Sequence, residues 1–239
     1  MPRFAGFPPE MPTFFDGLRR NNNRDWFQER KDVFEQKVKV PMTALVDALN
    51  AELAKSAPAY VTEPKGAIFR IYRDTRFSKD KTPYKDHIGA SFAPSTLGGK
   101  NSCSGLYAGV CDEKIEVAGG VYMPEAKQLL AIRTMLAEEY AEFARLAGAK
   151  VLRSLMGEVR GAQLTRVPKG FPPDHPAESL LRRKQWYFHA ELEPGLALTP
   201  KLVPEVTKRF LAIVPVLDFL NRPLIAAAKK HARAATMLE

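Results

Sequence analysis

The spacing of apolar residues changes twice along the chain, and this change constrains the fold more than any other feature. Between residues 13 and 56 apolar side chains recur at helical spacing, whereas from residue 66 to residue 122 they alternate as in strands. Helical spacing returns after Pro124. Strands grouped between helical ends predict an α+β fold, in which N-terminal, central and C-terminal helices pack on a largely antiparallel sheet, rather than a βαβ series.

The N-terminal quarter is expected to hold two or three short helices. Asn21, Asn22 and Asn23 interrupt the first helix, because asparagine favours turns and caps. Asn23 is suited to cap the second helix, with Asp25 beside its positive end. Pro41 is expected to open a further helix, since proline fits the first helical turn.

Runs rich in branched and aromatic residues predict six strands, of which the first four follow one another as an antiparallel meander. The third and fourth are expected to form a hairpin through Cys111, Asp112 and Glu113. The predicted strands are residues 67–73, 87–92, 105–110, 114–122, 163–167 and 185–192.

Helices are expected again after the hairpin. Pro124 begins the longest predicted helix, and the apolar stripe from Leu129 to Phe143 is expected to cover one face of the sheet. Shorter helices are predicted at residues 151–156 and after Pro176.

The C-terminal region is predicted to be helical from Thr199 to Leu220, with kinks or breaks at Pro204 and Pro215. Basic residues gather beyond it on an alanine-rich helix, which could follow a phosphate backbone or simply be a solvated terminal helix. These residues are Arg222, Lys229, Lys230, His231 and Arg233.

The chain has 239 residues and no stretch with the composition of a linker, so a single domain over residues 1–239 is predicted. Leu238 and Glu239 resemble a cloning scar. No apolar run approaches the ~20 residues of a membrane span, and the N-terminus lacks the apolar region of a signal peptide. We therefore expect a cytoplasmic protein without a membrane partner; the oligomeric state stays open.

The two cysteines, Cys103 and Cys111, match neither a disulfide framework nor the short spacing of zinc sites, and they are expected to be ordinary thiols. Gly119 and Gly120 belong to no phosphate-binding loop and are expected to let the strand bend or approach another backbone. No GxSxG elbow surrounds a serine, which argues against a serine nucleophile.

The formal net charge is +9, from 36 Lys plus Arg against 27 Asp plus Glu. A positive field favours anionic partners, including nucleic acid, because it raises their rate of encounter. The excess charge can equally serve solubility alone.

The charge is densest in residues 70–87, here called the charged segment, which read RIYRDTRFSKDKTPYKDH. Like charges about 4 Å apart repel by about 4 kcal/mol at an effective dielectric constant near 20. Six lysines and arginines face only three aspartates, so the segment needs further compensation, and a bound phosphate or carboxylate could supply it. The expected ligand-binding residues are Arg70, Arg73, Arg76, Lys81, Lys85 and His87.

Catalytic roles can be assigned within the same hypothesis. A strand would place Arg70 and Asp74 on one face, so that Asp74 orients the arginines, while Tyr84 or His175 donates a proton. The expected catalytic residues are therefore Asp74, Tyr84 and His175, with no cofactor and no metal.

Two alternatives remain open for the charged segment. In the first, it is structural: Arg70 and Asp74 form an internal ion pair, Phe77 and Tyr84 anchor the segment in the core, and the lysines are solvated. In the second, the same basic surface binds nucleic acid, with an affinity that falls steeply with salt. A structural ion-pair network should be closed to solvent, and a binding site should be open to it.

The charged segment also resembles a family of microbial and fungal proteins catalogued as the domain of unknown function 2461. The resemblance rests on the run from Arg70 to Phe77 followed by Asp80 to Lys85, and it extends to residues 22–27, 118–124 and 168–176. It implies no activity, substrate or cofactor. The loop from Ser95 to Ser104 departs from the family pattern.

Three further groups of residues have a functional and a structural interpretation. Asp174 and His175 beside Lys169 could exchange protons, or Asp174 could cap the helix after Pro176. His87, His175 and His189 could bind zinc, but no HxxxH or HExxH spacing supports it. Asn22, Arg24 and Trp26 could extend the charged segment's binding surface, or simply form a turn and pack in the core.

Overall fold

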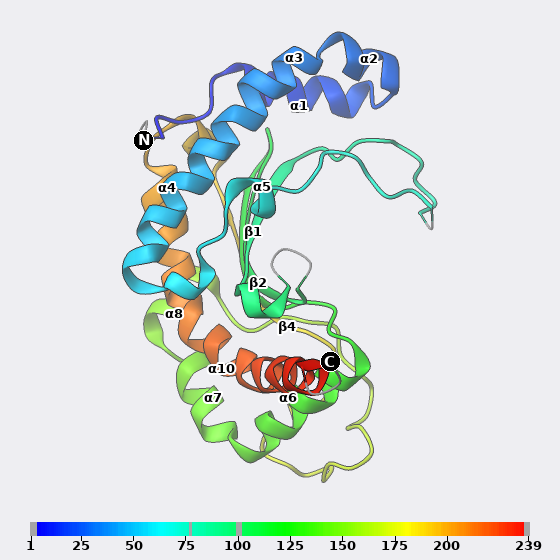
Figure 1. Cartoon of the computed structure of the whole chain (residues 1–239), viewed down its shortest axis with the longest axis vertical. Helices are drawn as coiled ribbons and strands as arrows, with labels where there is room; N and C mark the ends of the chain where they lie inside the picture. Colours follow the sequence, from blue (N-terminus) through cyan, green and yellow to red (C-terminus); the bar gives the residue numbers. More distant parts are fainter. Residues whose placement is uncertain (1–3, 77, 99–101, 237–239) are drawn as a thin grey trace.

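The computed structural model describes residues 4–76, 78–98 and 102–236. In these residues the predicted α+β architecture is confirmed: helices pack on an antiparallel sheet in which β1 to β4 lie in sequence order (Figure 1). Each strand buries alternate side chains, as a two-residue period requires. The strands are β1 (Ile88–Phe92), β2 (Ser104–Val110), β3 (Ile115–Val121) and β4 (Trp186–Leu192).

The N-terminal helices follow the sequence pattern closely. The side-chain oxygen of Asn23 accepts a hydrogen bond from the backbone N–H of Trp26 at 3.0 Å, so the predicted cap is confirmed. Pro41 lies in the first turn of its helix, also as predicted. The helices are α1 (Glu10–Arg20), α2 (Arg24–Glu29), α3 (Lys31–Val33) and, after a π-helical stretch at Phe34–Lys39, α4 (Val40–Ser56).

Two of the six predicted strands are wrong. Residues 67–73 contain the end of α5 (Pro64–Ala67) and then pair only through isolated bridges, from Ile68 to Ala90 and from Tyr72 to Tyr84. The backbone N–H of Arg73 donates to the carbonyl of Pro83 at 2.9 Å, but Pro83 has no N–H to return, which interrupts the ladder. Residues 163–167 form a single bridge, between Gln163 and Arg183.

A different helix from the predicted one covers the sheet. The longest described helix is α10 (Leu202–Thr236), which packs on β2 and β3. The predicted long helix is instead α6 (Ala126–Glu138), which packs on α10 and ends before α7 (Tyr140–Ala147). The remaining α-helices are α8 (Lys150–Met156) and α9 (Glu178–Leu181).

No break occurs at Pro204 or Pro215, because α10 is helical from Leu202 to Thr236, although Figure 1 shows the helix changing direction along its length. Pro204 lies in the first turn, where a backbone N–H has no helical partner to lose. Pro215 is flanked by the buried residues Val214, Val216 and Leu217, and their burial stabilises a helix that local preference disfavours.

Because α10 continues to Thr236, its apolar stretch is part of a longer helix than the one expected from the sequence, which ended at Leu220. By length and composition alone Leu202–Lys230 could cross a membrane, although 44% of its most apolar window is buried in the fold. The core helix of a soluble protein has the same properties, so this helix is weak evidence for a membrane span.

A buried polar network joins α10 to the sheet and to the turn that follows α4. The Asn221 side chain accepts a hydrogen bond from the hydroxyl of Ser104 and donates one to the hydroxyl of Tyr60 at 3.1 Å. Tyr60 in turn donates to a carboxylate oxygen of Asp218 at 2.6 Å. Ser104, Tyr60 and Asn221 are nearly inaccessible to solvent, so each polar group depends on the others.

Candidate functional site

Helices α4, α8 and α10 gather on one face of the sheet in the described part of the chain and leave the other face open (Figure 1). Side chains alternate along each strand, so in β2 Leu106 and Ala108 enter the core while Gly105 and Tyr107 lie on the open face. The open face is formed by Gly89, Ser91, Gly105, Tyr107, Gly109, Glu116, Ala118, Gly120, Tyr187, His189 and Glu191.

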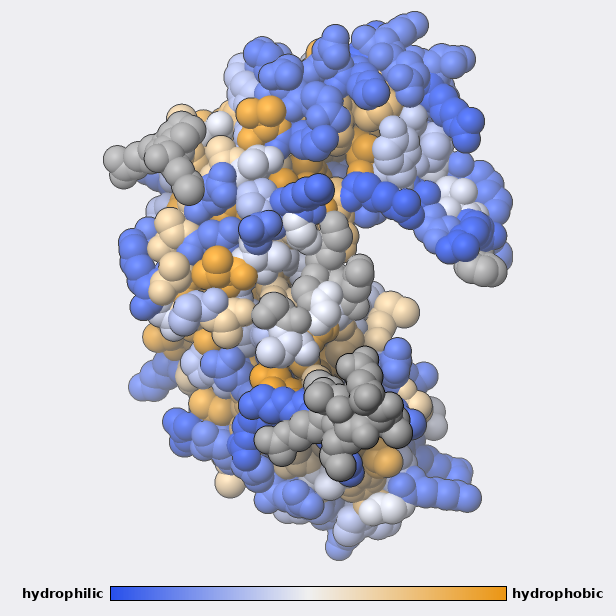
Figure 2. Space-filling view, in the orientation of Figure 1, coloured by the Kyte–Doolittle hydropathy of each residue, from blue (hydrophilic) through white to orange (hydrophobic). Residues whose placement is uncertain are grey.

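A hollow of about 670 Å³ lies over this face, here called the sheet hollow. Figure 2 shows the molecule indented between the projecting charged segment and the helices at the opposite end. Glycine and alanine on the strands provide the depth, because they carry little or no side chain. The side chains that line the sheet hollow are Phe69, His87, Ser91, Ser102, Cys103, Tyr107, Glu116, Tyr122, Tyr187 and His189.

Tyr107 lies at the centre of the open face. The strand register places Ser91 and Ala118 on either side of it, with His189 beyond Ala118. Its ring occupies the space over Gly89 and Gly109, since a Cβ atom on either glycine would stand 2.5 Å from its hydroxyl oxygen. Burial raises the pKa of Tyr107, and the negative charge of Glu116 raises it further.

The raised pKa of Tyr107 predicts a loss of stability at alkaline pH. Above pH ~10 the unfolded chain releases the phenolic proton while the folded chain retains it, so the free energy of unfolding falls by up to about 1.4 kcal/mol per pH unit. The Tyr107→Phe variant lacks this contribution. Urea unfolding between pH 9 and 11 should therefore show a shallower decline for the variant, and parallel declines would contradict the assignment.

Four charged or polar side chains from β3, β4 and the preceding turn form a network, of which Glu116 and His189 line the sheet hollow. Lys114 donates to Glu116 at 2.9 Å and to Glu191 at 2.8 Å, and His189 lies 3.4 Å from Glu116. Burial opposes the ionisation of Glu116, but Lys114 and His189 outweigh it and lower its pKa. The network thus holds Glu116 as a carboxylate, and both Glu116 and His189 are positioned to contact a molecule bound in the hollow.

The same network bears on metal binding. One ligand atom from each of Glu116, His189 and Glu191 lies within 4.8 Å of the others. The ammonium group of Lys114 already supplies the positive charge between the two carboxylates, so a cation would have to displace it. The zinc grouping considered from the sequence is not assembled, because His87 and His189 line the sheet hollow while His175 lines a separate depression.

Three of the six lysines and arginines in the charged segment have a partner within the segment itself among the described residues. Arg76 donates to both carboxylate oxygens of Asp74, at 3.0 and 2.7 Å, and Arg73 pairs with Asp80. These arginines hold the pKa of each aspartate at about 2. Lys81 donates to the carbonyl of Thr75 at 2.8 Å. The structural alternative expected internal ion pairs, and they are present, but Asp74 pairs with Arg76 and not with Arg70. The pair is open to solvent, because the Arg76 side chain is 77% exposed.

Tyr84 anchors the charged segment in the core, as the structural alternative expected. It is only 2% exposed, and its ring stacks on Phe27 with a centroid separation of 4.2 Å. Its backbone N–H and carbonyl both bond the Asn22 side chain at 3.0 Å. Burial raises the pKa of Tyr84 and keeps its proton from solvent, which does not favour a role as proton donor. Phe77 lies outside the described residues.

Three basic side chains stand where the charged segment joins the sheet, and we call Arg70, Lys85 and His87 the rim cations, of which His87 is charged only when protonated. The Lys85 ammonium lies 5.2 Å from the centre of the Phe69 ring, and burial followed by the charge of Arg70 lowers its pKa. His87 bonds Asp86 through Nδ1 at 2.9 Å. Among the described residues no carboxylate lies within ion-pair distance of Arg70 or Lys85.

His175 lies far from the charged segment. Figure 1 places the loop that contains it at the opposite end of the molecule, and it lines a small depression with Lys169 and Phe171. Its Nδ1 atom accepts a hydrogen bond from the backbone N–H of Ala177 at 3.0 Å. This bond lies in the turn before α9, which begins without a side-chain cap, so neither His175 nor Asp174 caps that helix. Asp74, Tyr84 and His175 do not converge.

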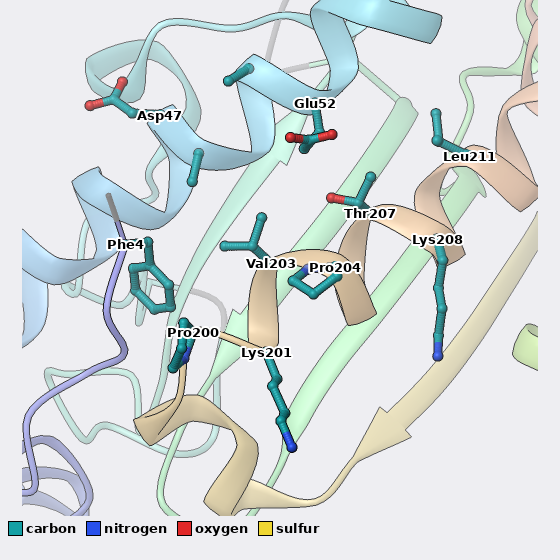
Figure 3. Close-up of a pocket in the computed structure, with 12 residues that line it drawn as sticks. Phe4, Asp47, Glu52, Pro200, Lys201, Val203, Pro204, Thr207, Lys208 and Leu211 are labelled. Carbon is teal, nitrogen blue, oxygen red and sulfur yellow. The ribbon is translucent and has the colours of Figure 1, made fainter. Parts of the chain in front are cut away.

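Two other depressions are alternative locations for a ligand: one of about 760 Å³ that is lined by Phe69, Arg70 and residues of α5, and a groove of about 800 Å³ between α4 and the start of α10. Figure 3 shows Lys201 and Lys208 extending away from α4, so their charges do not meet inside the groove. Its lining is mainly apolar, and Thr207 has a buried hydroxyl without a hydrogen bond. The groove lacks the convergent polar groups of the sheet hollow.

Several residues of the sheet hollow were missed by the sequence analysis, among them Tyr107, Glu116, Tyr122 and Tyr187. A signal for them existed, because polar residues and glycines alternate with apolar residues along the predicted strands. Burial raises the pKa of the Cys103 and Cys111 thiols, which agrees with the expectation that both are ordinary thiols.

A family model described as "Conserved hypothetical protein (DUF2461)" matches residues 10–219. No curated protein and no solved structure matches the chain. The matched residues include the whole charged segment and every side chain that lines the sheet hollow, and the match ends within α10.

Proposed function

The chain belongs to the DUF2461 family of conserved hypothetical proteins, and from this premise we propose that it binds a small ligand with a phosphate or carboxylate group in the sheet hollow. The anionic group lies against the rim cations, and the rest of the ligand lies on the open face. The proposal moves the anion from Arg73, Arg76 and Lys81, which have partners in the charged segment, to Arg70 and Lys85, which have no carboxylate within ion-pair distance among the described residues. His87 stands beside them, although it bonds Asp86.

The observation that carries the proposal is the position of Lys85. Its ammonium is partly buried and lies 5.2 Å from the centre of the ring of Phe69, which lines the hollow, and among the described residues no carboxylate is within ion-pair distance of it. Removing a charge from water costs free energy unless an opposite charge compensates it. A ligand anion between Lys85, Arg70 and His87 would supply the compensation.

Two side chains that line the hollow, Glu116 and His189, carry groups that can accept or donate a proton. In this proposal Glu116 and His189 take the proton-transfer role that the sequence analysis gave to Tyr84 and His175, because both line the hollow. Asp74 keeps a structural role as the partner of Arg76.

Inorganic phosphate tests the proposal directly. We expect Lys85→Ala to raise the dissociation constant of phosphate about 10-fold, equivalent to about 1.4 kcal/mol. Lys79→Ala is the matched control, because it removes the same charge from an exposed position in the same segment. Calorimetric titration at fixed ionic strength should show no more than about a 2-fold change for the control.

Two outcomes would overturn this proposal. If the wild-type protein does not bind phosphate, the rim cations are not an anion site. If the two lysine variants lose affinity equally, the attraction comes from the general positive field and not from the hollow.

The shape of the charged segment favours nucleic acid as a second candidate partner. The segment projects from the body of the protein (Figure 1), and Arg76, Lys79 and Lys81 are exposed along it. For duplex DNA the roles of the two variants should reverse, with Lys79→Ala weakening binding more than Lys85→Ala. The logarithm of the affinity should fall with the logarithm of salt concentration with a slope of about −0.9 per phosphate contacted. Salt-independent or absent binding would exclude this candidate.

A further inference from the structure

The depression of about 760 Å³ beside α5, here called the α5 depression, is a second candidate site. Among the described residues Phe69 alone lines both this depression and the sheet hollow, so the two are separate spaces. Residues of α5, of the segment that follows it and of the π-helical stretch Phe34–Lys39 form its walls. Its volume is within the range of about 300 to 1,000 Å³ that is usual for small-molecule sites.

The floor of the α5 depression is apolar. Phe34, Ile71 and Ile88 line it and are buried, so they belong to the core and also form the bottom of the depression. Ile68 lines it as well and is only partly buried. An apolar group bound here would remove this surface from water, which is favourable.

A rare backbone conformation contributes to the wall. Phe34–Lys39 is π-helical, and π-helical turns occur frequently at functional sites. Three of its residues, Phe34, Glu35 and Lys39, line the depression. Lys39 donates to Glu35 at 2.7 Å, so these two charges compensate each other.

The other charges that line the α5 depression are not compensated in this way. Neither Lys65 nor Arg70 lies within ion-pair distance of a carboxylate in the described part of the chain. The lining has three cations and two carboxylates, Glu35 and Glu63, and so keeps a net positive charge. Arg70 is exposed, and its planar fork can donate two hydrogen bonds to one carboxylate.

We propose that the α5 depression binds an amphiphilic carboxylate, a small molecule with a carboxylate group and an alkyl chain. The carboxylate pairs with Arg70, and the chain lies on Ile68 and the buried floor. One ligand can contact both, because Ile68 and Arg70 are two residues apart and their Cα atoms are at most about 7 Å apart. This site goes beyond the proposed function, since its ligand does not occupy the sheet hollow.

Three probes separate the chain from the charge: octanoate, acetate and octanol. We expect octanoate to bind at least about 10-fold more tightly than acetate, because acetate lacks the chain. It should also bind at least about 10-fold more tightly than octanol, which has the chain without the charge. Calorimetric titration at pH 7 and fixed ionic strength measures all three.

Arg70→Gln tests the position of the carboxylate. The variant should bind octanoate about 10-fold more weakly and octanol as the wild type does. Arg76→Gln is the matched control, because Arg76 is an exposed arginine of the same charged segment that does not line the depression. It should change the affinity for octanoate by no more than about 2-fold.

Ile68→Thr tests the position of the chain and should weaken octanoate binding about 5-fold, without changing the affinity for acetate. Val159→Thr is the control, because Val159 is also partly buried against the core but does not line the depression. It should leave the affinity for octanoate unchanged. Thermal unfolding establishes that each variant is folded, and Arg70→Gln, at an exposed position, keeps the test decisive if Ile68→Thr is not.

The outcomes distinguish this site from the proposed function. If inorganic phosphate binds with the dependence on Lys85 stated above but octanoate binds no better than acetate or octanol, the amphiphilic carboxylate is refuted and the proposed function stands. If octanoate binds as expected and phosphate does not bind, the reverse holds. An octanoate affinity that survives in Arg70→Gln, or falls equally in Arg76→Gln, refutes the site proposed here.

Discussion

Replacing Gly120 with alanine is expected to lower the free energy of unfolding by about 4 kcal/mol, from backbone strain and overpacking together. Gly120 has a φ of +143°, which side chains other than glycine rarely adopt. A Cβ atom would also overlap the carbonyl oxygen of Trp186 and stand 2.5 Å from the Cα atom of Tyr187. Both obstacles are backbone atoms of β4, so the strands would have to separate. The prediction that this glycine allows close backbone approach is thereby confirmed.

Gly170→Ala is the matched control for this substitution. Gly170 also has a positive φ, of +94°, but nothing lies within 4 Å of its Cβ position. The free energy of unfolding of Gly170→Ala should fall only by the cost of placing alanine in this backbone conformation, about 1 to 2 kcal/mol. Urea unfolding followed by tryptophan fluorescence measures both variants. Equal losses would mean that the contact between β3 and β4 contributes nothing.

Asn221→Ala should cost about 3 kcal/mol, because it leaves a cavity and removes a partner from two buried hydroxyl groups. Asn221 is 1% exposed and connects Ser104 on β2 with Tyr60 beyond α4. Asn50→Ala is the control: Asn50 also bonds through both side-chain atoms, to Thr62, but it is only partly buried. The free energy of unfolding of Asn50→Ala should fall by about 1 to 1.5 kcal/mol.

A double-mutant cycle separates the cavity from the orphaned hydroxyl. Adding Ser104→Ala to Asn221→Ala removes the hydroxyl that has lost its acceptor, and should recover about 1 kcal/mol. Guanidinium unfolding of the two single variants and the double variant gives the interaction energy. Additive losses would show that Ser104 and Asn221 are not energetically coupled.

Local sequence determined the elements whose stability depends on near neighbours. The cap at Asn23 needs only the N–H of Trp26, three residues away, and the hairpin of β2 and β3 needs only alternation and a short turn. The pairing of Arg76 with Asp74 is similarly local. The predicted strands at 67–73 and 163–167 failed because a regular strand needs a partner along its length, and alternation does not show whether one exists.

The candidate site was predictable only in part. The sequence located the charged segment, and Lys85 and His87 within it do line or border the sheet hollow. It could not show that Arg73 and Arg76 already have partners, since the pairing depends on how the segment turns. It also grouped His175 with residues from the opposite end of the molecule, because sequence pattern contains no information on long-range distance.

The sequence by itself determined that this chain alternates helical and strand regions, that β1, β2 and β3 follow one another as an antiparallel meander, and that its cations concentrate in residues 70–87. It placed residues 67–73 in that meander wrongly and did not join β4 to it. Only the tertiary structure decided which face of the sheet is open. Alternation sorts side chains into two faces, but α10 selects the face it covers by burying Leu106, Val117 and their neighbours. Tyr107, Glu116 and His189 lie on the opposite face. They can form a site because the hydrophobic contacts that hold α10 against the sheet involve only the face of Leu106 and Val117.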